Sequence, residues 1–179
     1  SWRFDRIGGL PAALPLAWST ILALRGSGVG VAAVTHAAGV SSIDGGAVDA
    51  TLPWPERSAI PQATVDAIGA TRGRGGRVIA VGTTVVRALE GRIAAAGRLV
   101  AGEGVATVVF DGSERPAVVD GVVTKLHAPD ESHFRVLTPF APAGLLIAAF
   151  RAAAARGLRN HEFGDSVLIV GSPDGTVAG

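Results

Sequence analysis

Polar side chains that can transfer protons or hold an anion stand at the ends of several short apolar runs. A histidine beside a carboxylate can serve proton transfer, and an arginine near two hydroxyls can hold an anionic group. If the apolar runs are strands of one parallel sheet, their ends meet at one edge. The four clusters are Thr35-His36; Gly82, Thr83, Thr84 and Arg87; Asp120, Thr124 and His127; and His161, Glu162 and Asp165.

Each cluster also has a structural interpretation. His36 and His127 can be buried histidines whose ring nitrogens bond to the backbone. Asp120 stands before Gly121 and can be a turn residue, and Asp165 can cap a turn. For any one residue taken singly, the structural interpretation is favoured.

The segment Arg77-Val-Ile-Ala-Val-Gly-Thr-Thr-Val-Val-Arg-Ala-Leu-Glu90 joins a strand signal to a helix signal. Residues 78–81 are apolar and mostly β-branched, which is typical of a buried strand. Gly82 breaks the strand, and Thr83 and Thr84 are good helix N-caps. A helix is predicted from there to about residue 96. Its predicted inner face consists of Val85, Val86, Leu89 and Ile93, with Arg87 and Glu90 mostly off it.

This strand, turn and helix would aim the free N–H groups of the first helical turn at one point. Two threonine hydroxyls would lie beside that point, which favours an anion or a polar ligand. The carboxyl end of a strand in an open parallel sheet is also where ligands bind. The competing interpretation is an ordinary connection between strand and helix.

Apolar runs and helical periods alternate along the rest of the chain. This alternation predicts an α/β fold, with a mixed, mostly parallel sheet and flanking helices. The predicted domain covers residues 14–170, after a lead-in segment (1–13) and before a loose tail (171–179). Helices are predicted over 14–25, 61–70, 131–137 and 143–155. Strands are predicted over 29–34, 99–100, 105–110, 122–124 and 167–170, and residues 43–61 read as a loop.

Composition limits the class of protein. The chain has 179 residues, of which 48% are hydrophobic and 17% charged, so a globular domain with a real core is expected. No apolar run is long enough to span a bilayer and no signal-peptide pattern is present, so a cytoplasmic protein without a membrane partner is predicted. The net charge of +1 gives no overall attraction to nucleic acid.

No metal site is predicted. The chain has no cysteine, and His127 and His133 are six residues apart, which is not one of the usual ligand spacings. The glycine-rich stretch 26–30 precedes a predicted strand instead of following one, so it is not a dinucleotide-binding loop.

Three separated motifs occur in the order and spacing of one enzyme family. They are Val81-Gly-Thr-Thr-Val-Val-Arg-Ala-Leu-Glu90, Val119-Asp-Gly-Val-Val-Thr124 followed by His127, and Phe163-Gly-Asp165 before the last strand. The segment Pro55-Glu-Arg57 resembles a further stretch with a glutamate upstream. From about residue 14 to 170 the chain resembles the C-terminal portion of a divergent S-adenosylmethionine:tRNA ribosyltransferase-isomerase.

The resemblance implies a fold and a reaction. Members of this family have an α/β domain and an inserted β-barrel domain, and the barrel has no counterpart in this chain. They transfer and isomerise the ribosyl part of S-adenosylmethionine onto a 7-aminomethyl-7-deazaguanine in tRNA. The product is epoxyqueuosine, and adenine and methionine are released. The implied co-substrate is S-adenosylmethionine, the implied partner is tRNA, and no metal is implied.

The resemblance also implies roles for the polar clusters. The ligand pocket would contain Gly82, Thr83, Thr84 and Arg87, with Asp120, Thr124 and His127 across from them. His127 or His36 would move a proton, Asp120 would bind ribose hydroxyls or balance the sulfonium, and Arg87 would pair with a carboxylate such as that of methionine. Glu56 and Asp165 complete the expected substrate-binding residues.

Some residues depart from the family pattern. The family usually has His-Val-Gly-x-Gly-Thr-Phe where this chain has His36-Ala-Ala-Gly-Val-Ser-Ser42. Lys125 replaces the usual asparagine, and Trp54-Pro55 replaces the usual histidine. A divergent or truncated homologue that binds S-adenosylmethionine, with another acceptor or without catalysis, is therefore an alternative. An unrelated α/β protein with structural polar residues is a third possibility.

Overall fold

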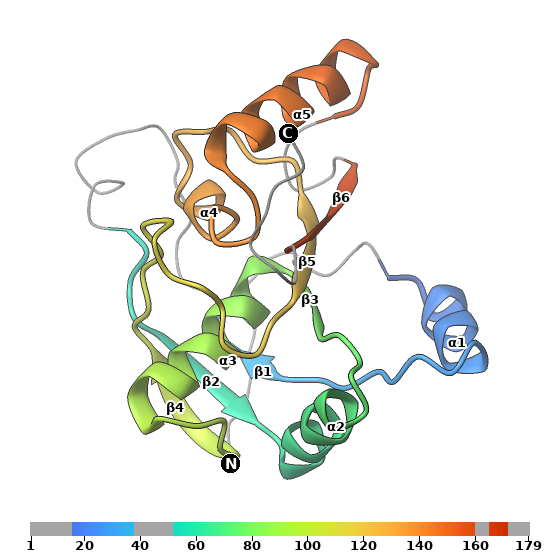
Figure 1. Ribbon diagram of the computed structural model, residues 1–179, viewed down its shortest axis with the longest axis vertical. Helices are drawn as coiled ribbons and strands as arrows, with labels where there is room; N and C mark the ends of the chain where they lie inside the picture. Colours follow the sequence, from blue (N-terminus) through green and yellow to red (C-terminus); the bar gives the residue numbers. More distant parts are fainter. Residues whose placement is uncertain (1–15, 38–51, 160–164, 172–179) are drawn as a thin grey trace.

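The computed structural model describes residues 16–37, 52–159 and 165–171 and contains helices and two small sheets (Figure 1). The helices are α1 (Trp18–Gly26), α2 (Gln62–Gly73), α3 (Thr83–Ala96), α4 (Ser132–Arg135) and α5 (Ala143–Ala155). The strands are β1 (Thr35–His36), β2 (Glu56–Ile60), β3 (Ile79–Val81), β4 (Gly102–Ala106), β5 (Gly121–Lys125) and β6 (Ser166–Val170). The mixed α/β class predicted from the sequence is confirmed.

The strands form two three-stranded sheets in the orders β1-β2-β4 and β3-β5-β6. Only the β3–β5 pair is parallel among the described strands, and the other three pairings are antiparallel. The prediction of a mostly parallel sheet was therefore wrong. Alternation of helices and strands indicates the class, but it does not fix the direction in which β6 returns beside β5.

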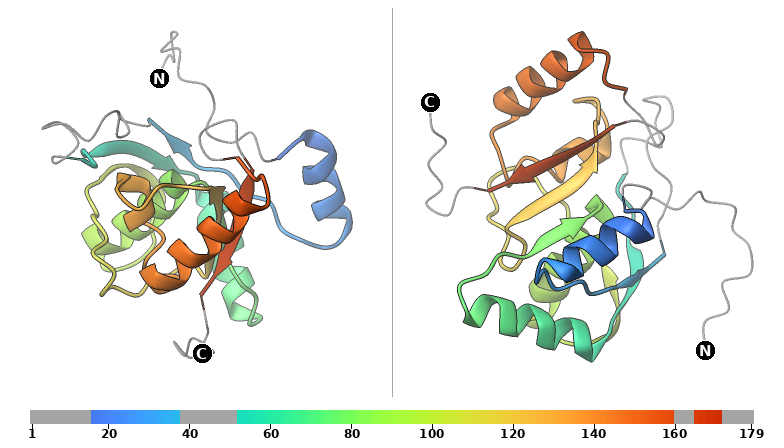
Figure 2. Two further views of the ribbon diagram at one scale, coloured as in Figure 1. Left: turned by 90° about the horizontal axis from the view of Figure 1, so that it is seen from above. Right: turned by 90° about the vertical axis from the view of Figure 1, so that its right-hand side faces the viewer.

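Helix α3 lies at the centre of the fold and contacts strands of both sheets. Figure 2 shows the β3-β5-β6 sheet and the β1-β2-β4 sheet as separate layers of the same body. Val86 and Leu89 of α3 are buried in the core that the two sheets share. Gly91 lets the helix approach β4 closely, because a Cβ at this position would lie 3.2 Å from the Cα of Ala106.

Contact with both sheets also explains why α3 buries polar residues. Arg87 and Glu90 were predicted to lie mostly off the inner face, and both are buried. A helix packed against one layer has one apolar stripe. This helix is covered on more than one side, so its side chains off that stripe are buried as well.

The predictions for individual elements were largely correct. Helix α5 has the predicted bounds, and α2, α3 and α4 lie within two or three residues of theirs. Strands β3, β5 and β6 also occur where expected, whereas residues 29–34 and 99–100 are not strands. The strand predicted over 105–110 occurs earlier, as β4. The lead-in segment 1–13 and the tail beyond Gly171 lie outside the described residues, and the absence of an inserted barrel stays a prediction.

Strand β2 was missed, because residues 43–61 read as a loop between prolines. Pro55 and Pro61 bracket the strand and do not interrupt it. Glu56, Ser58 and Ile60 are buried while the residues between them are more exposed, which is the alternation of a strand with one covered face. The buried positions include a charge, so this period of two did not read as a hydrophobic pattern.

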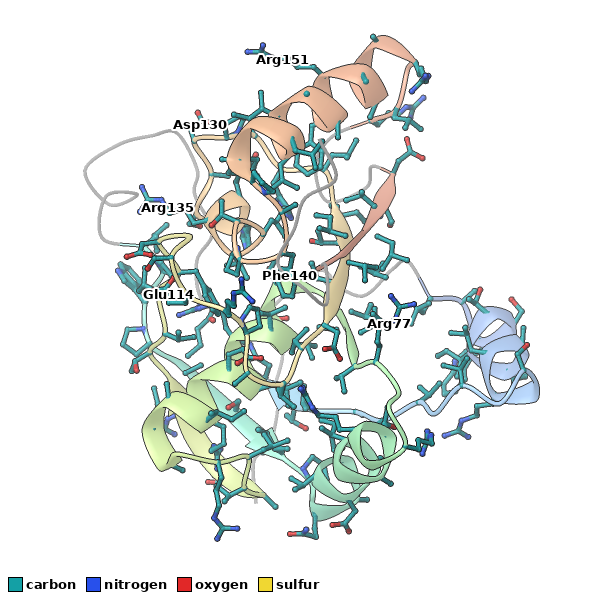
Figure 3. All side chains as sticks on the ribbon, in the orientation of Figure 1. Arg77, Glu114, Asp130, Arg135, Phe140 and Arg151 are labelled. Atoms are coloured by element: carbon teal, nitrogen blue, oxygen red, sulfur yellow. The ribbon has the colours of Figure 1, made fainter. Side chains whose placement is uncertain are left out.

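The periphery differs from this centre. Helix α1 buries none of its residues, and Trp18 is 79% exposed. Figure 3 shows Arg151 of α5 projecting away from the body, whereas Phe140 lies inside it. None of the described helices is both long and apolar enough to cross a membrane.

Candidate functional site

The turn between β3 and α3 lies where the sequence indicated. Gly82 has φ 95° and ψ 144°, a region that is essentially restricted to glycine. Its N–H group donates a hydrogen bond to the carbonyl of Val123 at 2.8 Å, which ties the turn to β5. Gly82 itself is the N-cap residue, and neither Thr83 nor Thr84 makes a side-chain cap bond. The two threonines therefore begin the helix but do not cap it.

Arg87 projects from α3 toward β2 and forms a buried ion pair with Glu56. Its Nη2 group donates to the carbonyl of Trp54 at 2.9 Å, and its Nε group donates to the carbonyl of Val108 at 3.3 Å. Burial lowers the pKa of the Arg87 guanidinium, and the charge of Glu56 opposes that shift. The side chain that was expected to hold a substrate carboxylate thus directs donors to the protein's own Glu56.

His36 lies beside the same carboxylate. Its Nε2 atom is 3.4 Å from Oε2 of Glu56, and its side chain is 7% exposed. Neither ring nitrogen has a hydrogen-bond partner among the described residues. A buried polar group without a partner costs free energy, so such a group suggests a ligand-binding or catalytic role.

The protonation state of His36 follows from its surroundings. Burial lowers the pKa of His36 most strongly, Glu56 raises it, and Arg87 lowers it again. The net shift is below the ordinary value of 6.5, so the imidazole is neutral at neutral pH. A neutral imidazole can accept a proton, and the adjacent carboxylate would then stabilise the imidazolium.

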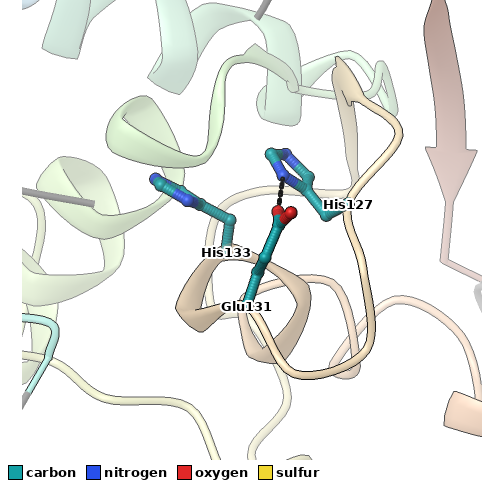
Figure 4. Close-up of side chains that lie close together, drawn as sticks. All are labelled: His127, Glu131 and His133. Atoms are coloured by element: carbon teal, nitrogen blue, oxygen red, sulfur yellow. Dashed lines mark hydrogen bonds and ion pairs between the residues drawn. The ribbon is translucent and has the colours of Figure 1, made fainter. Parts of the chain in front are cut away.

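His127 belongs to a second polar cluster, at the end of β5 and the start of α4 (Figure 4). Its Nε2 atom is 3.0 Å from the hydroxyl of Thr124, and its Nδ1 atom is 3.0 Å from Oε2 of Glu131. The ring of His133 stacks on it at 5.0 Å between centroids. Both ring nitrogens of His127 are thus engaged within the protein, in contrast to those of His36.

The two clusters are close enough to interact electrostatically. Burial lowers the pKa of His133 first, and the charge of His127 lowers it further. Glu131 and Glu56 raise this pKa, and Arg87 lowers it. The charges of the Arg87–Glu56 pair therefore reach His133, and one polar region includes residues from β1, β2, α3 and α4.

Asp120 is not part of this region. It precedes β5, whereas Thr124 lies near the other end of that strand, about 13 Å away at ~3.3 Å per residue, and His127 lies beyond that end. Its carboxylate accepts a hydrogen bond from the N–H group of Val78 at 2.7 Å. The structure thus gives Asp120 a role in joining the starts of the two parallel strands.

Asp165 lies at the same edge as the carboxyl end of β5, because the adjacent Ser166 pairs with Lys125. Its carboxylate accepts a hydrogen bond from the N–H group of Arg159 at 2.8 Å. Its own N–H group donates to the Arg159 carbonyl at 3.0 Å. This exposed residue therefore bonds to the backbone of Arg159, which favours its structural interpretation. Its predicted companions His161 and Glu162 lie outside the described residues.

Glu90 is a buried residue for which no role was predicted from the sequence. Its carboxylate accepts three hydrogen bonds, from the backbone N–H groups of Ala117, Val118 and Val119, at 2.7, 3.0 and 2.8 Å. These bonds fix the chain segment that leads into β5. Only its place in the family-like motif ending at Glu90 singled it out in the sequence.

A hollow of about 280 Å³ lies on the β1-β2-β4 sheet. In this sheet Thr35 pairs with Ala59, and His36 pairs with Ser58. Because side chains alternate along a strand, Thr35 and Ala59 point to the face opposite His36 and Glu56. The hollow is therefore on the other side of the sheet from the polar region. Its lining residues are Thr35, Ala37, Arg57, Ser58, Ala59, Glu103, Gly104 and Val105.

Comparison with known proteins gives consistent matches. Residues 10–169 match the family described as queuosine biosynthesis protein. An S-adenosylmethionine:tRNA ribosyltransferase-isomerase of Geobacter sulfurreducens is 43% identical over 64% of this chain and 33% of its own length. The enzyme of that name from Sorangium cellulosum is 37% identical over 94% of this chain and 47% of its own length.

A solved structure supports the same relationship. The crystal structure of an S-adenosylmethionine tRNA ribosyltransferase from Thermotoga maritima matches with a TM-score of 0.67 and 30% sequence identity. The match covers 89% of this chain and 51% of that protein. The chain thus spans between about a third and a half of the length of the relatives described here. The family match, which covers most of the sequence, shows that this chain belongs to the queuosine biosynthesis protein family.

Proposed function

We propose that the chain takes part in transferring and isomerising the ribosyl moiety of S-adenosylmethionine onto a 7-aminomethyl-7-deazaguanine in tRNA. The product would be epoxyqueuosine, with adenine and methionine released. The names of its relatives and the family match support this proposal. The observation in this chain that best supports the proposal is the environment of the buried His36. Its ring nitrogens lack hydrogen-bond partners among the described residues, and the ring lies beside Glu56.

The reaction requires a base beside the sulfonium. The positive sulfur acidifies the hydrogens on the adjacent 5′ carbon, and a neutral imidazole can accept one of them. Of the two histidines that sequence reasoning considered, His36 fits this role better. Its ring nitrogens are buried and have no hydrogen-bond partner among the described residues, whereas those of His127 contact Thr124 and Glu131.

Glu56 and Arg87 would act through His36. The Glu56 carboxylate lies beside Nε2 of His36, where it would orient the imidazole ring and stabilise the imidazolium that forms. Arg87 fixes Glu56 through the buried ion pair and its two bonds to backbone carbonyls. In this proposal Arg87 is a positioning residue, and the methionine carboxylate binds elsewhere.

The turn at Gly82 would contribute to the ligand pocket. It lies at the carboxyl ends of the parallel strands β3 and β5, beside Thr83, Thr84 and Thr124. This edge is where α/β proteins bind ligands. The proposal places the polar parts of S-adenosylmethionine between this turn and His36.

A second candidate function is an S-adenosylmethionine-binding homologue with another acceptor or without catalysis. The sequence departures after His36, at Lys125 and at Trp54 favour it. The carbonyl of Trp54 bonds to Arg87, so one of these departures lies directly at the polar region.

One experiment separates the two functions. The protein is incubated with S-adenosylmethionine and with tRNA that carries the aminomethyl deazaguanine, and both pools are analysed by mass spectrometry. The proposal expects the mass gain of epoxyqueuosine in tRNA, with adenine and methionine in equal amounts. Binding of S-adenosylmethionine without adenine release, with or without tRNA, would favour the second function and contradict the first.

A further inference from the structure

Three side chains that can bind metal ions converge on the loop between β5 and α4 and on the first turn of α4. They are His127, Glu131 and His133, and one nitrogen or oxygen atom from each lies within 4.8 Å of the others. Figure 4 shows the Glu131 carboxylate directed at the His127 ring, with the His133 ring beside it. We propose that these three residues bind one divalent transition-metal ion of the Zn²⁺ type.

The donor set suits this class of ion. Two imidazole nitrogens and one carboxylate oxygen form a ligand set found at zinc sites, in which a water molecule completes the coordination. Imidazole donors also select zinc and its neighbours over magnesium and calcium, which prefer oxygen ligands.

The required movement is small. Ligands on a tetrahedral zinc ion lie ~3.3 Å apart, given metal–ligand distances of about 2.0–2.1 Å. Nδ1 of His127 and Oε2 of Glu131 are already 3.0 Å apart. The His127 and His133 rings are inclined by only 21°, so His133 must turn about its side-chain bonds to direct a nitrogen at the ion. The remaining separation is at most 4.8 Å, which is about 1.5 Å more than the spacing on a tetrahedral ion.

Thr124 supplies an outer contact of the kind that metal-binding histidines have. Its hydroxyl lies 3.0 Å from Nε2 of His127. A ligating histidine generally donates its other ring N–H group to such a partner, which fixes the ring orientation. With Nε2 bonded to Thr124, Nδ1 faces Glu131 and is the nitrogen available to the ion.

The nearest charge favours a cation. Glu131 supplies a negative charge within the cluster, whereas Glu56 and Arg87 are a pair of opposite charges outside it that both act on His133. The site does not use His36, although Thr124 lies beside both the cluster and the Gly82 turn, so the test measures metal binding and not turnover.

The proposal is tested by titrating the purified, metal-free protein with ZnCl₂ in a calorimeter at neutral pH. Co²⁺ serves as a spectroscopic probe, because its visible absorption reports ligand number and type. We expect one ion per chain with micromolar or tighter affinity. Glu131→Gln and His133→Asn should each weaken binding at least tenfold, and Thr124→Val should weaken it by about tenfold.

Asp66→Asn is the matched control for Glu131→Gln, because it exchanges a carboxylate for an amide at an exposed residue of α2 that is not in the cluster, and it should leave the affinity unchanged. Circular dichroism of each variant establishes that it is folded, and the isosteric Glu131→Gln exchange keeps the test valid if His133→Asn unfolds. Absence of Zn²⁺ binding up to millimolar concentration would overturn the proposal. Equal affinity in the wild type and in folded Glu131→Gln would overturn it as well.

Discussion

Arg87→Met should lower the free energy of unfolding by about 3–5 kcal/mol, a large part of the stability of a typical domain. The substitution keeps an unbranched side chain of similar length and removes the guanidinium. Glu56 then remains in a buried site without its charged partner, and the carbonyls of Trp54 and Val108 lose donors. Chemical denaturation followed by circular dichroism measures the change.

A double-mutant cycle tests the stated cause. Glu56→Gln removes the charge that Arg87→Met leaves unpaired, so the double variant should lose less stability than the sum of the two single changes. Arg151→Met on the exposed face of α5 is the matched control, and it should change stability by less than about 0.5 kcal/mol. Additive effects of the two substitutions at Arg87 and Glu56 would contradict the pairing.

Glu90→Gln should destabilise the protein by on the order of 3 kcal/mol, because the Glu90 carboxylate accepts hydrogen bonds from the backbone N–H groups of three consecutive residues. The amide of glutamine has one oxygen acceptor, and its NH₂ group faces N–H donors. At least one buried N–H group therefore loses its partner. The same denaturation experiment measures the global effect.

The loss at Glu90 should also be local. Hydrogen exchange of the amides of Val118 and Val119 should accelerate more than that of amides in α5. Asp66→Asn, an exposed carboxylate on α2, provides the control and should leave both stability and exchange nearly unchanged. Unaltered protection of Val118 and Val119 in Glu90→Gln would contradict the bonding described.

The central strand, turn and helix could be predicted from the sequence, because local signals specify each part. Gly82 supplies the positive φ, and a continuous apolar run before it gives way to a helical period of 3.6 after it. The ends of parallel strands were also expected to meet at one edge. The parallel pairing of β3 with β5 does bring the Gly82 turn near Thr124. The strand, turn and helix depend on residues close together in the sequence, whereas the β3–β5 pairing joins distant residues such as Ile79 and Gly121.

The partners of the polar residues could not be predicted in the same way. Arg87 and Glu56 are 31 residues apart, and their contact depends on β2, which the flanking prolines concealed. Asp120 is part of the same motif as Thr124, yet it precedes β5 and lies at the opposite end of that strand from Thr124. Glu131 and His133 lie near His127 because the loop between β5 and α4 turns back toward it. The spacing of these residues in the sequence is not one of the usual metal-ligand spacings, so it did not indicate the cluster.

The most direct test of the central claim follows hydrogen at the 5′ carbon of S-adenosylmethionine. The co-substrate is deuterated there and incubated with tRNA and either the wild-type protein, His36→Asn or the control Asp66→Asn. If His36 is the base, deuterium passes to water with the wild type and with the control, and at least about 100-fold more slowly with folded His36→Asn. Deuterium loss at the wild-type rate in His36→Asn would contradict the account.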